Sequence, residues 1–306
     1  MMLDVREVET LGEEVAWSRV PPPVDPDPRP ASTIGWGFWV CVAWLVVIAL
    51  LALLAPHLGL KDPNEHYIVR ELGRPPYPPS SEFWFGTDQD ARDVFSRTIH
   101  GARVSLIVGL SAMTCGVLVG GTLGMLAGYF RGALDRIVSF VFLVQLSFPA
   151  LLLAILITSL LERTVFTVAA TLGFLAIAPV GQLARATTIQ YAERDFVMAA
   201  RVLGAPHRRV IVRELLPNVA VPMGALALLG VGMAIVAEGA LAFLGLSVRD
   251  QLTWGELIML GSGSRDLARA PWIAMGPILV LFLTVLALNF GGDKIREHFD
   301  VRETMV

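Results

Sequence analysis

The stretch DFVMAARVLGAPHRRVIVRELLPN, residues 195–218, is a polar, arginine-rich island between two long apolar runs. Asp195 can cap a helix, because its carboxylate can accept hydrogen bonds from the backbone N–H groups of a first turn. Gly204 suits the left-handed position that ends a helix, and Pro206 is well placed to open another. Pro217 is expected to break that second helix before the next apolar run. The island is therefore predicted to be two short helices joined by a sharp bend.

Two interpretations of this island remain open on its residues alone. Phe196, Ala200 and Leu203 fall on one face of the first helix, at spacings of four and three residues. A basic amphipathic element of this kind can lie on the lipid surface, where arginine side chains meet anionic headgroups. It can equally be a knob that docks into a soluble partner, since the small side chains of Ala199 and Ala200 would allow close approach.

The composition of the chain is that of an integral membrane protein. Hydrophobic residues make up 55% of the 306 positions and charged residues only 17%, whereas a soluble domain carries about 25% charged residues. The net charge of −3 and the lack of a basic patch interleaved with aromatics argue against nucleic acid as a partner. The two cysteines cannot form a zinc set, and no two histidines have metal-ligand spacing, so we expect no metal site.

The two lysines bear on nucleotide binding. Lys61 is followed by Asp62 and Lys294 by Ile295, so neither belongs to the G-x-x-x-x-G-K-[ST] loop that cradles nucleotide phosphates. If ATP drives the protein, another chain binds it. The serines have no recognisable histidine and aspartate partners for nucleophilic catalysis. We therefore expect that the chain is not an enzyme.

Six apolar runs are long enough to cross a bilayer as helices, which takes about 20 residues. They cover residues 34–55, 104–128, 137–161, 165–183, 219–246 and 272–290. Pro149 is expected to kink the third run. Gly120 and Gly124 form a G-x-x-x-G pattern, which lets helix backbones approach closely; packing within one subunit is favoured over dimerisation. The prediction is an all-α membrane protein with about six transmembrane helices.

The remaining segments give the chain its order and orientation. Residues 1–33 are expected to be a disordered, proline-rich tail. A first transmembrane helix is expected at 34–56, followed by an extracytoplasmic loop at 57–101 with one short helix near 90–100. A core of five transmembrane helices is expected at 102–292, and it includes the island loop at 193–217 and a polar loop at 247–271. A charged tail at 293–306 ends the chain. Six spans place both termini on one side, and the arginine density of 185–213 assigns that side to the cytoplasm.

Among the polar residues inside the apolar runs, Glu238 and Asn289 are candidates for a functional or bundle-packing role. Glu238 is past the middle of the fifth run, where a carboxylate is costly unless it faces a protein or water-lined interior. A hydrogen-bonding role in packing the bundle is favoured for it over lining a pathway. Asn289, near the end of the sixth run, is expected to bridge helices by hydrogen bonding.

Several motifs resemble one known family. The pattern A-A-x-x-x-G followed by L-P, at Ala199, Ala200, Gly204, Leu216 and Pro217, resembles the EAA loop of permease subunits in bacterial ABC importers. Met198 stands where that family often has glutamate. Further segments resemble the C-type inner-membrane permease subunits of dipeptide, oligopeptide and nickel importers: FGTDQDARDVFSRTIHGARVSLIVGL at 85–110, EGALAFLGL at 238–246, TWGELI at 253–258, APWIAMGP at 270–277 and LNFGGDKIRE at 288–297. Together the matches run from about residue 82 to 302.

The resemblance implies the permease fold of a type I ABC importer, with a cytoplasmic coupling helix between the fourth and fifth spans. It implies a multi-pass location in the cell's inner membrane, a homologous second permease subunit, one or two ABC ATPase subunits that bind ATP and magnesium, and an extracytoplasmic binding protein that delivers a peptide. The residues expected to couple to the ATPase are Phe196, Ala199, Ala200, Leu203, Gly204, Ala205, Arg208, Leu216 and Pro217. No cofactor is expected in this chain itself.

A mixed-charge patch in the first external loop has two interpretations. It consists of Asp88, Arg92, Asp93 and Arg97. It can be a solvated helix face with an Asp93–Arg97 pair four residues apart, or a docking surface for the binding protein.

The function that we favour from the sequence is that of a permease subunit in an ATP-driven importer, with di- or oligopeptides as substrate. The alternative is a stand-alone channel or secondary transporter with the island as a surface helix. Such transporters commonly show internal repeats and midplane ionisable groups, and Glu238 is the one candidate for such a group here.

Overall fold

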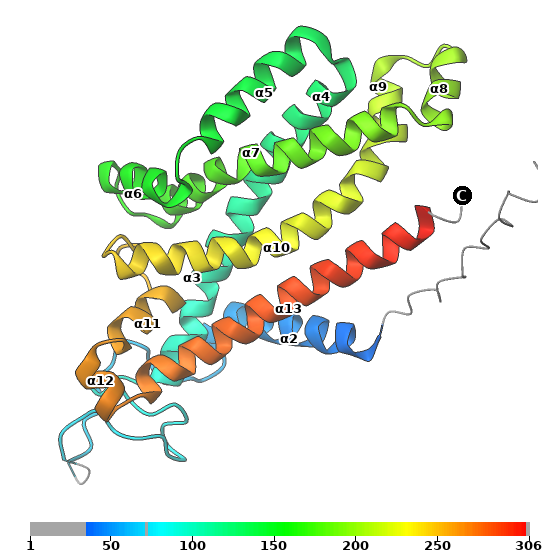
Figure 1. Ribbon diagram of the computed structural model, residues 1–306. Coiled ribbons are helices and arrows are strands. Elements are labelled where there is room, and N and C mark those ends of the chain that lie inside the picture. The colour runs from blue at the N-terminus through cyan, green and yellow to red at the C-terminus, as the bar shows by residue number, and fades with distance from the viewer. Residues whose placement is uncertain (1–34, 71–72, 304–306) are drawn as a thin grey trace, which may run out of the picture.

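The regular structure is helical in the computed structural model, which describes residues 35–70 and 73–303 (Figure 1). The tail predicted at residues 1–33 lies outside the described residues. Five helical stretches are long and apolar enough to cross a membrane: Trp36–His57, Val94–Phe130, Val165–Ala192, His207–Phe243 and Trp272–Glu297. A sixth candidate is a bent pair of helices, so the prediction of about six spans is confirmed.

The first span agrees with the prediction, and the last helix is longer than predicted. α2, Trp36–Leu54, is the first span. α13, Trp272–Glu303, is the last, and it continues as a helix through residues that the sequence assigns to a C-terminal tail. The two helices pack side by side, and the indole N–H of Trp44 donates to the hydroxyl of Thr284 over 3.2 Å.

The second span begins earlier than predicted. α3, Val94–Cys115, a π-helical segment, Gly116–Gly121, and α4, Thr122–Phe130, form one continuous helix. The separate short helix predicted near 90–100 is therefore wrong. The physical reason is that Asp93 caps the helix at 2.7 Å from the Ser96 nitrogen, and the polar residues of the first turns are buried with partners instead of being solvated.

The third span is broken, not merely kinked. α5, Gly132–Leu146, and α6, Ala150–Leu160, meet at an angle of 83°. Pro149 lies at the break, as predicted, but its effect is larger than a kink. Proline has no N–H to donate, and it also disfavours the helical conformation at Phe148.

Contacts at the two ends of the bent pair show that it crosses the bundle. α4 ends beside α9, His207–Arg209, where the rings of Tyr129 and His207 have centroids 5.6 Å apart. α7, Val165–Ala192, begins at the other end of the bundle, where Arg163 donates to the carbonyl of Gly245. The pair therefore carries the chain from one end to the other, which with the five long helical stretches makes six crossings of the bundle in residues 35–70 and 73–303.

The fifth span is continuous with the second half of the island. α9 leads through a π-helical segment, Val210–Leu215, into α10, Leu216–Phe243. The prediction that Pro217 breaks this helix is wrong. Pro217 lies in the first turn of α10, directly after the wider π-helical turn, and that turn lets the helix continue past the proline.

The π-helical segment at 116–121 and α4 approach α7 through glycines. A Cβ atom at Gly120 would lie 2.2 Å from the carbonyl oxygen of Ile177, and one at Gly124 would lie 2.0 Å from that of Gly181. These distances leave no room for any side chain. The prediction that the G-x-x-x-G pattern serves packing within the subunit is confirmed.

The loop predicted at 247–271 contains two helices, α11, Trp254–Gly261, and α12, Ser264–Arg269. α11 packs into the bundle beside α3, where Trp254 is fully buried. Its indole N–H donates to the Thr98 carbonyl at 2.9 Å, and its backbone N–H donates to the Ser105 hydroxyl at 3.0 Å. Thr253 and Trp254, at the start of α11, are thus part of the core, which the prediction of a loop missed.

Both ends of the described chain lie at the end of the bundle that carries the island. A Cβ atom at Gly37 would be 3.5 Å from the ring of Phe290, so the start of α2 lies beside the last part of α13. A Cβ atom at Gly292 would be 3.0 Å from the carbonyl oxygen of Ala225 in the first half of α10. Figure 1 shows α8 and α9 projecting beyond the long helices at this end.

Candidate functional site

The candidate site is the α8–α9 loop, residues 193–217, which contains α8, Asp195–Val202, and α9. The predicted bend between two short helices is present. Gly204 has φ +79°, and the N–H of Ala205 donates to the Ala200 carbonyl at 3.0 Å, which closes the end of α8. Arg194, not Asp195, is the N-cap of α8, and Asp195 lies in the first turn without a capping hydrogen bond.

The inner side of the loop has its own small core. Val197, Val210 and Leu215 are fully buried and pack with Tyr129 and Ala192. The partly buried side chains of Ala200 and Ala205 pack against this cluster. The second alanine of the A-A pair is therefore small because it faces the inside of the loop, whereas Ala199 is exposed.

The outer side of the loop ends in an apolar tip. Val202 and Leu203 are 87% and 86% exposed, and Phe196 is 42% exposed. The predicted face of Phe196, Ala200 and Leu203 is thus divided, because Ala200 turns inward. The other predicted coupling residues, Arg208, Leu216 and Pro217, are exposed. The loop presents apolar and basic side chains together on a compact projection.

The loop is fastened to the end of the second span by contacts that sequence reasoning missed. The hydroxyl of Tyr129 and the Nδ1 of His207 are 2.8 Å apart, and the guanidinium of Arg201 lies 4.9 Å from the Tyr129 ring centroid. Beside them, Arg131 forms an ion pair with Glu193 at 2.6 Å. Residues 129 and 207 are far apart in sequence, so no local pattern could have paired them.

Glu238 lies inside the chain and not on a surface that could line a pathway. It is fully buried, and its Oε1 accepts from the Ser247 hydroxyl at 3.2 Å. Its Oε2 lies close to α11, because a Cβ atom at Gly255 would be 3.1 Å from it. This placement fits a packing role between α10 and α11. Asn289 is half-buried and faces Gly232 of α10. A Cβ atom added at Gly232 would be 3.7 Å from the Asn289 Oδ1.

The mixed-charge patch is largely internal. Asp93 and Arg97 are buried and form no ion pair with each other in the described part of the chain, which corrects the predicted pair. Arg97 instead lies 3.8 Å from Asp88 and donates to the Pro63 carbonyl at 2.9 Å. Burial raises the pKa of the Asp93 carboxyl. Asp93 and Arg97 are therefore not available for docking, while Arg92, paired with Asp88 at 2.8 Å, keeps some exposure.

Comparison with known proteins gives consistent results. Residues 120–304 match the family model described as binding-protein-dependent transport system inner membrane component. The chain is 35% identical to the dipeptide transport system permease protein DppC of Alkalihalophilus pseudofirmus over 85% of each chain. It is 34% identical to the di/tripeptide transport system permease protein DppC of Pseudomonas aeruginosa over 84% of this chain and 85% of that protein. It is 33% identical to the glutathione transport system permease protein GsiD of Pectobacterium atrosepticum, also over 84% and 85%.

Proposed function

Because the chain belongs to the family of binding-protein-dependent transport system inner membrane components, we propose that its α8–α9 loop docks onto the ATPase subunit of its importer. The chain is a transmembrane permease subunit of an ABC importer and is not itself catalytic. A stand-alone channel or secondary transporter, the alternative interpretation of the sequence, does not fit this family. Permeases of the family work with an ATPase, a binding protein and a second permease.

The apolar tip carries this proposal. Two adjacent aliphatic side chains, Val202 and Leu203, are almost fully exposed at the end of a loop that has its own packed interior. An exposed apolar projection of this kind gains free energy when a partner's cleft covers it. The proposed contact set is the tip residue Val202 together with Phe196, Ala199, Leu203, Gly204, Arg208, Leu216 and Pro217, while Ala200 and Ala205 shape the loop from inside.

The loop also sets the proposed orientation. Its arginines and both ends of the described chain lie at one end of the bundle, which we place in the cytoplasm by the positive-inside rule. The opposite end, with α11 and α12, then faces the extracytoplasmic binding protein. ATP and magnesium are bound by the ATPase subunits. Because relatives are named as dipeptide, di/tripeptide and glutathione permeases, we propose short peptides as the substrate.

Leu203→Glu tests the docking surface. The side chain is 86% exposed, so a carboxylate there leaves the fold intact but places a charge in the proposed apolar contact. We expect the variant to insert normally, to lose co-purification of the ATPase subunit, and to lose peptide uptake. Ile68→Glu is a matched control, because Ile68 is 69% exposed in the first external loop and should leave ATPase co-purification unchanged.

A second variant tests the bend. Gly204 has φ +79°, and a Cβ atom there would touch nothing within 4 Å, so the cost of Gly204→Val is conformational and not steric. The variant should reorient the tip and reduce uptake while the spans still insert. Normal uptake and ATPase association in both loop variants would show that this loop is not the docking surface.

A further inference from the structure

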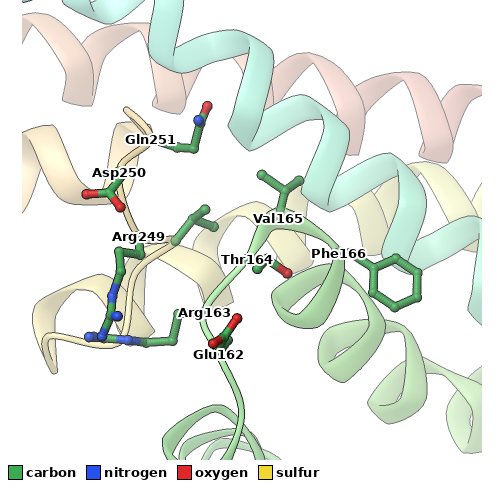
Figure 2. Close-up of a pocket in the computed structure, with 9 residues that line it drawn as sticks. Glu162, Arg163, Thr164, Val165, Phe166, Arg249, Asp250 and Gln251 are labelled. Atoms are coloured by element: carbon green, nitrogen blue, oxygen red, sulfur yellow. The ribbon is translucent and has the colours of Figure 1, made fainter.

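A cavity of about 510 Å³ lies at the end of the bundle opposite the α8–α9 loop. It is formed where the connection between α6 and α7 meets the segment that follows α10 (Figure 2). Its lining residues are Glu162, Arg163, Thr164, Val165, Phe166, Val248, Arg249, Asp250 and Gln251. α7 has 28 residues, so at about 1.5 Å per residue the cavity is about 42 Å from the loop.

The two walls of this cavity are held together by one backbone hydrogen bond and one side-chain hydrogen bond. The N–H of Arg249 donates to the Arg163 carbonyl at 2.7 Å, and the Arg163 guanidinium donates to the carbonyl of Gly245. Asp250 follows with φ +55°, a left-handed conformation that is uncommon for a residue with a side chain. The cavity is therefore a built junction between two connections and not a gap between loose loops.

The charges of the cavity are balanced but unpaired. Glu162 and Asp250 contribute two carboxylates, and Arg163 and Arg249 two guanidinium groups. None of the four is in an ion pair with any described residue. Figure 2 shows both arginine side chains extending toward the same side of the cavity, with the Asp250 carboxylate pointing away from them. Among the described residues, the one side-chain hydrogen bond of these four groups runs from Arg163 to the neutral carbonyl of Gly245, so both signs of charge stay available to a ligand.

The shape and walls suit a small molecule. The volume falls within the roughly 300–1,000 Å³ of small-molecule sites. Val165, Phe166 and Val248 supply apolar wall, and the charged residues Glu162 and Arg249 are exposed, which leaves the cavity open to entry. A ligand that carries one carboxylate and one ammonium group would satisfy both kinds of charge.

We propose that this cavity is a transient subsite that holds a short peptide by its two free termini at the extracytoplasmic mouth of the permease. Arg163 and Arg249 receive the C-terminal carboxylate, since guanidinium groups bind carboxylates through paired hydrogen bonds. Glu162 and Asp250 receive the N-terminal ammonium group. This inference rests on the proposed function and adds that free peptide termini, and not side chains, are what the permease itself recognises.

Equilibrium binding of radiolabelled alanyl-alanine to the purified importer, without the binding protein, tests the subsite. The wild type should bind this dipeptide at least tenfold more tightly than its C-terminal amide. Arg163→Gln combined with Arg249→Gln should abolish that preference while leaving binding of the amide unchanged. Arg265→Gln with Arg269→Gln is the matched control, because both arginines are exposed on α12 and lie outside the cavity.

The acidic side is tested in the same way. Glu162→Gln with Asp250→Asn should abolish the preference for alanyl-alanine over its N-acetyl form. The subsite would be overturned if these variants kept the preferences of the wild type. It would also be overturned if they lost uptake without any change in dipeptide binding, a result that would indicate a contact with the binding protein. Wild-type uptake and ATPase association in the same preparations separate this failure from a failure of the proposed function.

Discussion

Gly124→Ala is the sharpest test of how the bundle is packed. The new Cβ atom would lie 2.0 Å from the carbonyl oxygen of Gly181, where a carbon and an oxygen in contact need about 3.3–3.6 Å. The neighbour is backbone, so no side-chain rotation can relieve the clash, and α4 must move away from α7. Gly224→Ala is the control, because Gly224 is also helical and its Cβ atom would meet nothing within 4 Å.

The expected magnitude follows from two opposing terms. Overpacking costs about 1–3 kcal/mol, and the backbone contact places this site at the upper end of that range. Replacing glycine by alanine within a helix stabilises the folded state by roughly 0.5–1 kcal/mol. Gly124→Ala should therefore lose about 2 kcal/mol, which is more than a tenfold change in the unfolding equilibrium, whereas Gly224→Ala should lose nothing.

Thermal unfolding of the purified importer in mild detergent, followed by tryptophan fluorescence, measures both variants against the wild type. Gly124→Ala should unfold at a distinctly lower temperature than Gly224→Ala. Equal unfolding temperatures for the two variants would refute the close packing of α4 on α7.

Three further predictions concern single contacts. Tyr129→Phe removes the hydrogen bond to His207, which is worth about 0.5–1.5 kcal/mol. The backbone amide hydrogens of α8 should therefore exchange several-fold faster with solvent, and unchanged exchange would show that this bond does not hold the loop. Trp254→Ala empties a fully buried site and should destabilise the bundle by about 3–5 kcal/mol. Trp254→Phe keeps an aromatic ring and loses the N–H that donates to Thr98, so it should destabilise the bundle much less. Equal unfolding temperatures for these two variants would contradict the packing argument. Burial raises the pKa of the Glu256 carboxyl, so the folded state holds this proton at pH values where the unfolded chain has lost it. Stability should therefore fall as pH rises from about 4.3 through the raised pKa. The unfolding temperature of Glu256→Gln should fall less over this pH range than that of the wild type, and identical pH profiles would disprove the prediction.

Much of the candidate site could be predicted because it depends on local chain properties. The bend of the α8–α9 loop depends on a glycine that can take φ +79° followed by a proline, both visible in a short window. The packing role of Gly120 and Gly124 depends on a four-residue spacing that puts both on one helix face. In both cases the residues of a short sequence window determine the local conformation or helix face, and the structure agrees with the prediction.

The errors share a different cause. Pro149 in a helix allows anything from a kink to a full break, and the packing of the two resulting helices decides the 83° angle. Pro217 was expected to end a helix, but a π-helical segment before it lets the helix continue. The patch around Arg97 looked solvated because its side chains are charged, yet the preceding loop covers it. In each case the outcome depends on a contact beyond the local window.

The sequence by itself therefore determined the class of the protein, the number of its membrane crossings and the position of the bend in the α8–α9 loop, since these follow from apolar length, composition and backbone freedom. Only the tertiary structure decided that Tyr129 fastens this loop to the second span through His207, and that Arg163 and Arg249 come together beside one cavity. Residues 78 and 86 positions apart in the chain meet only because long helices bring their ends together.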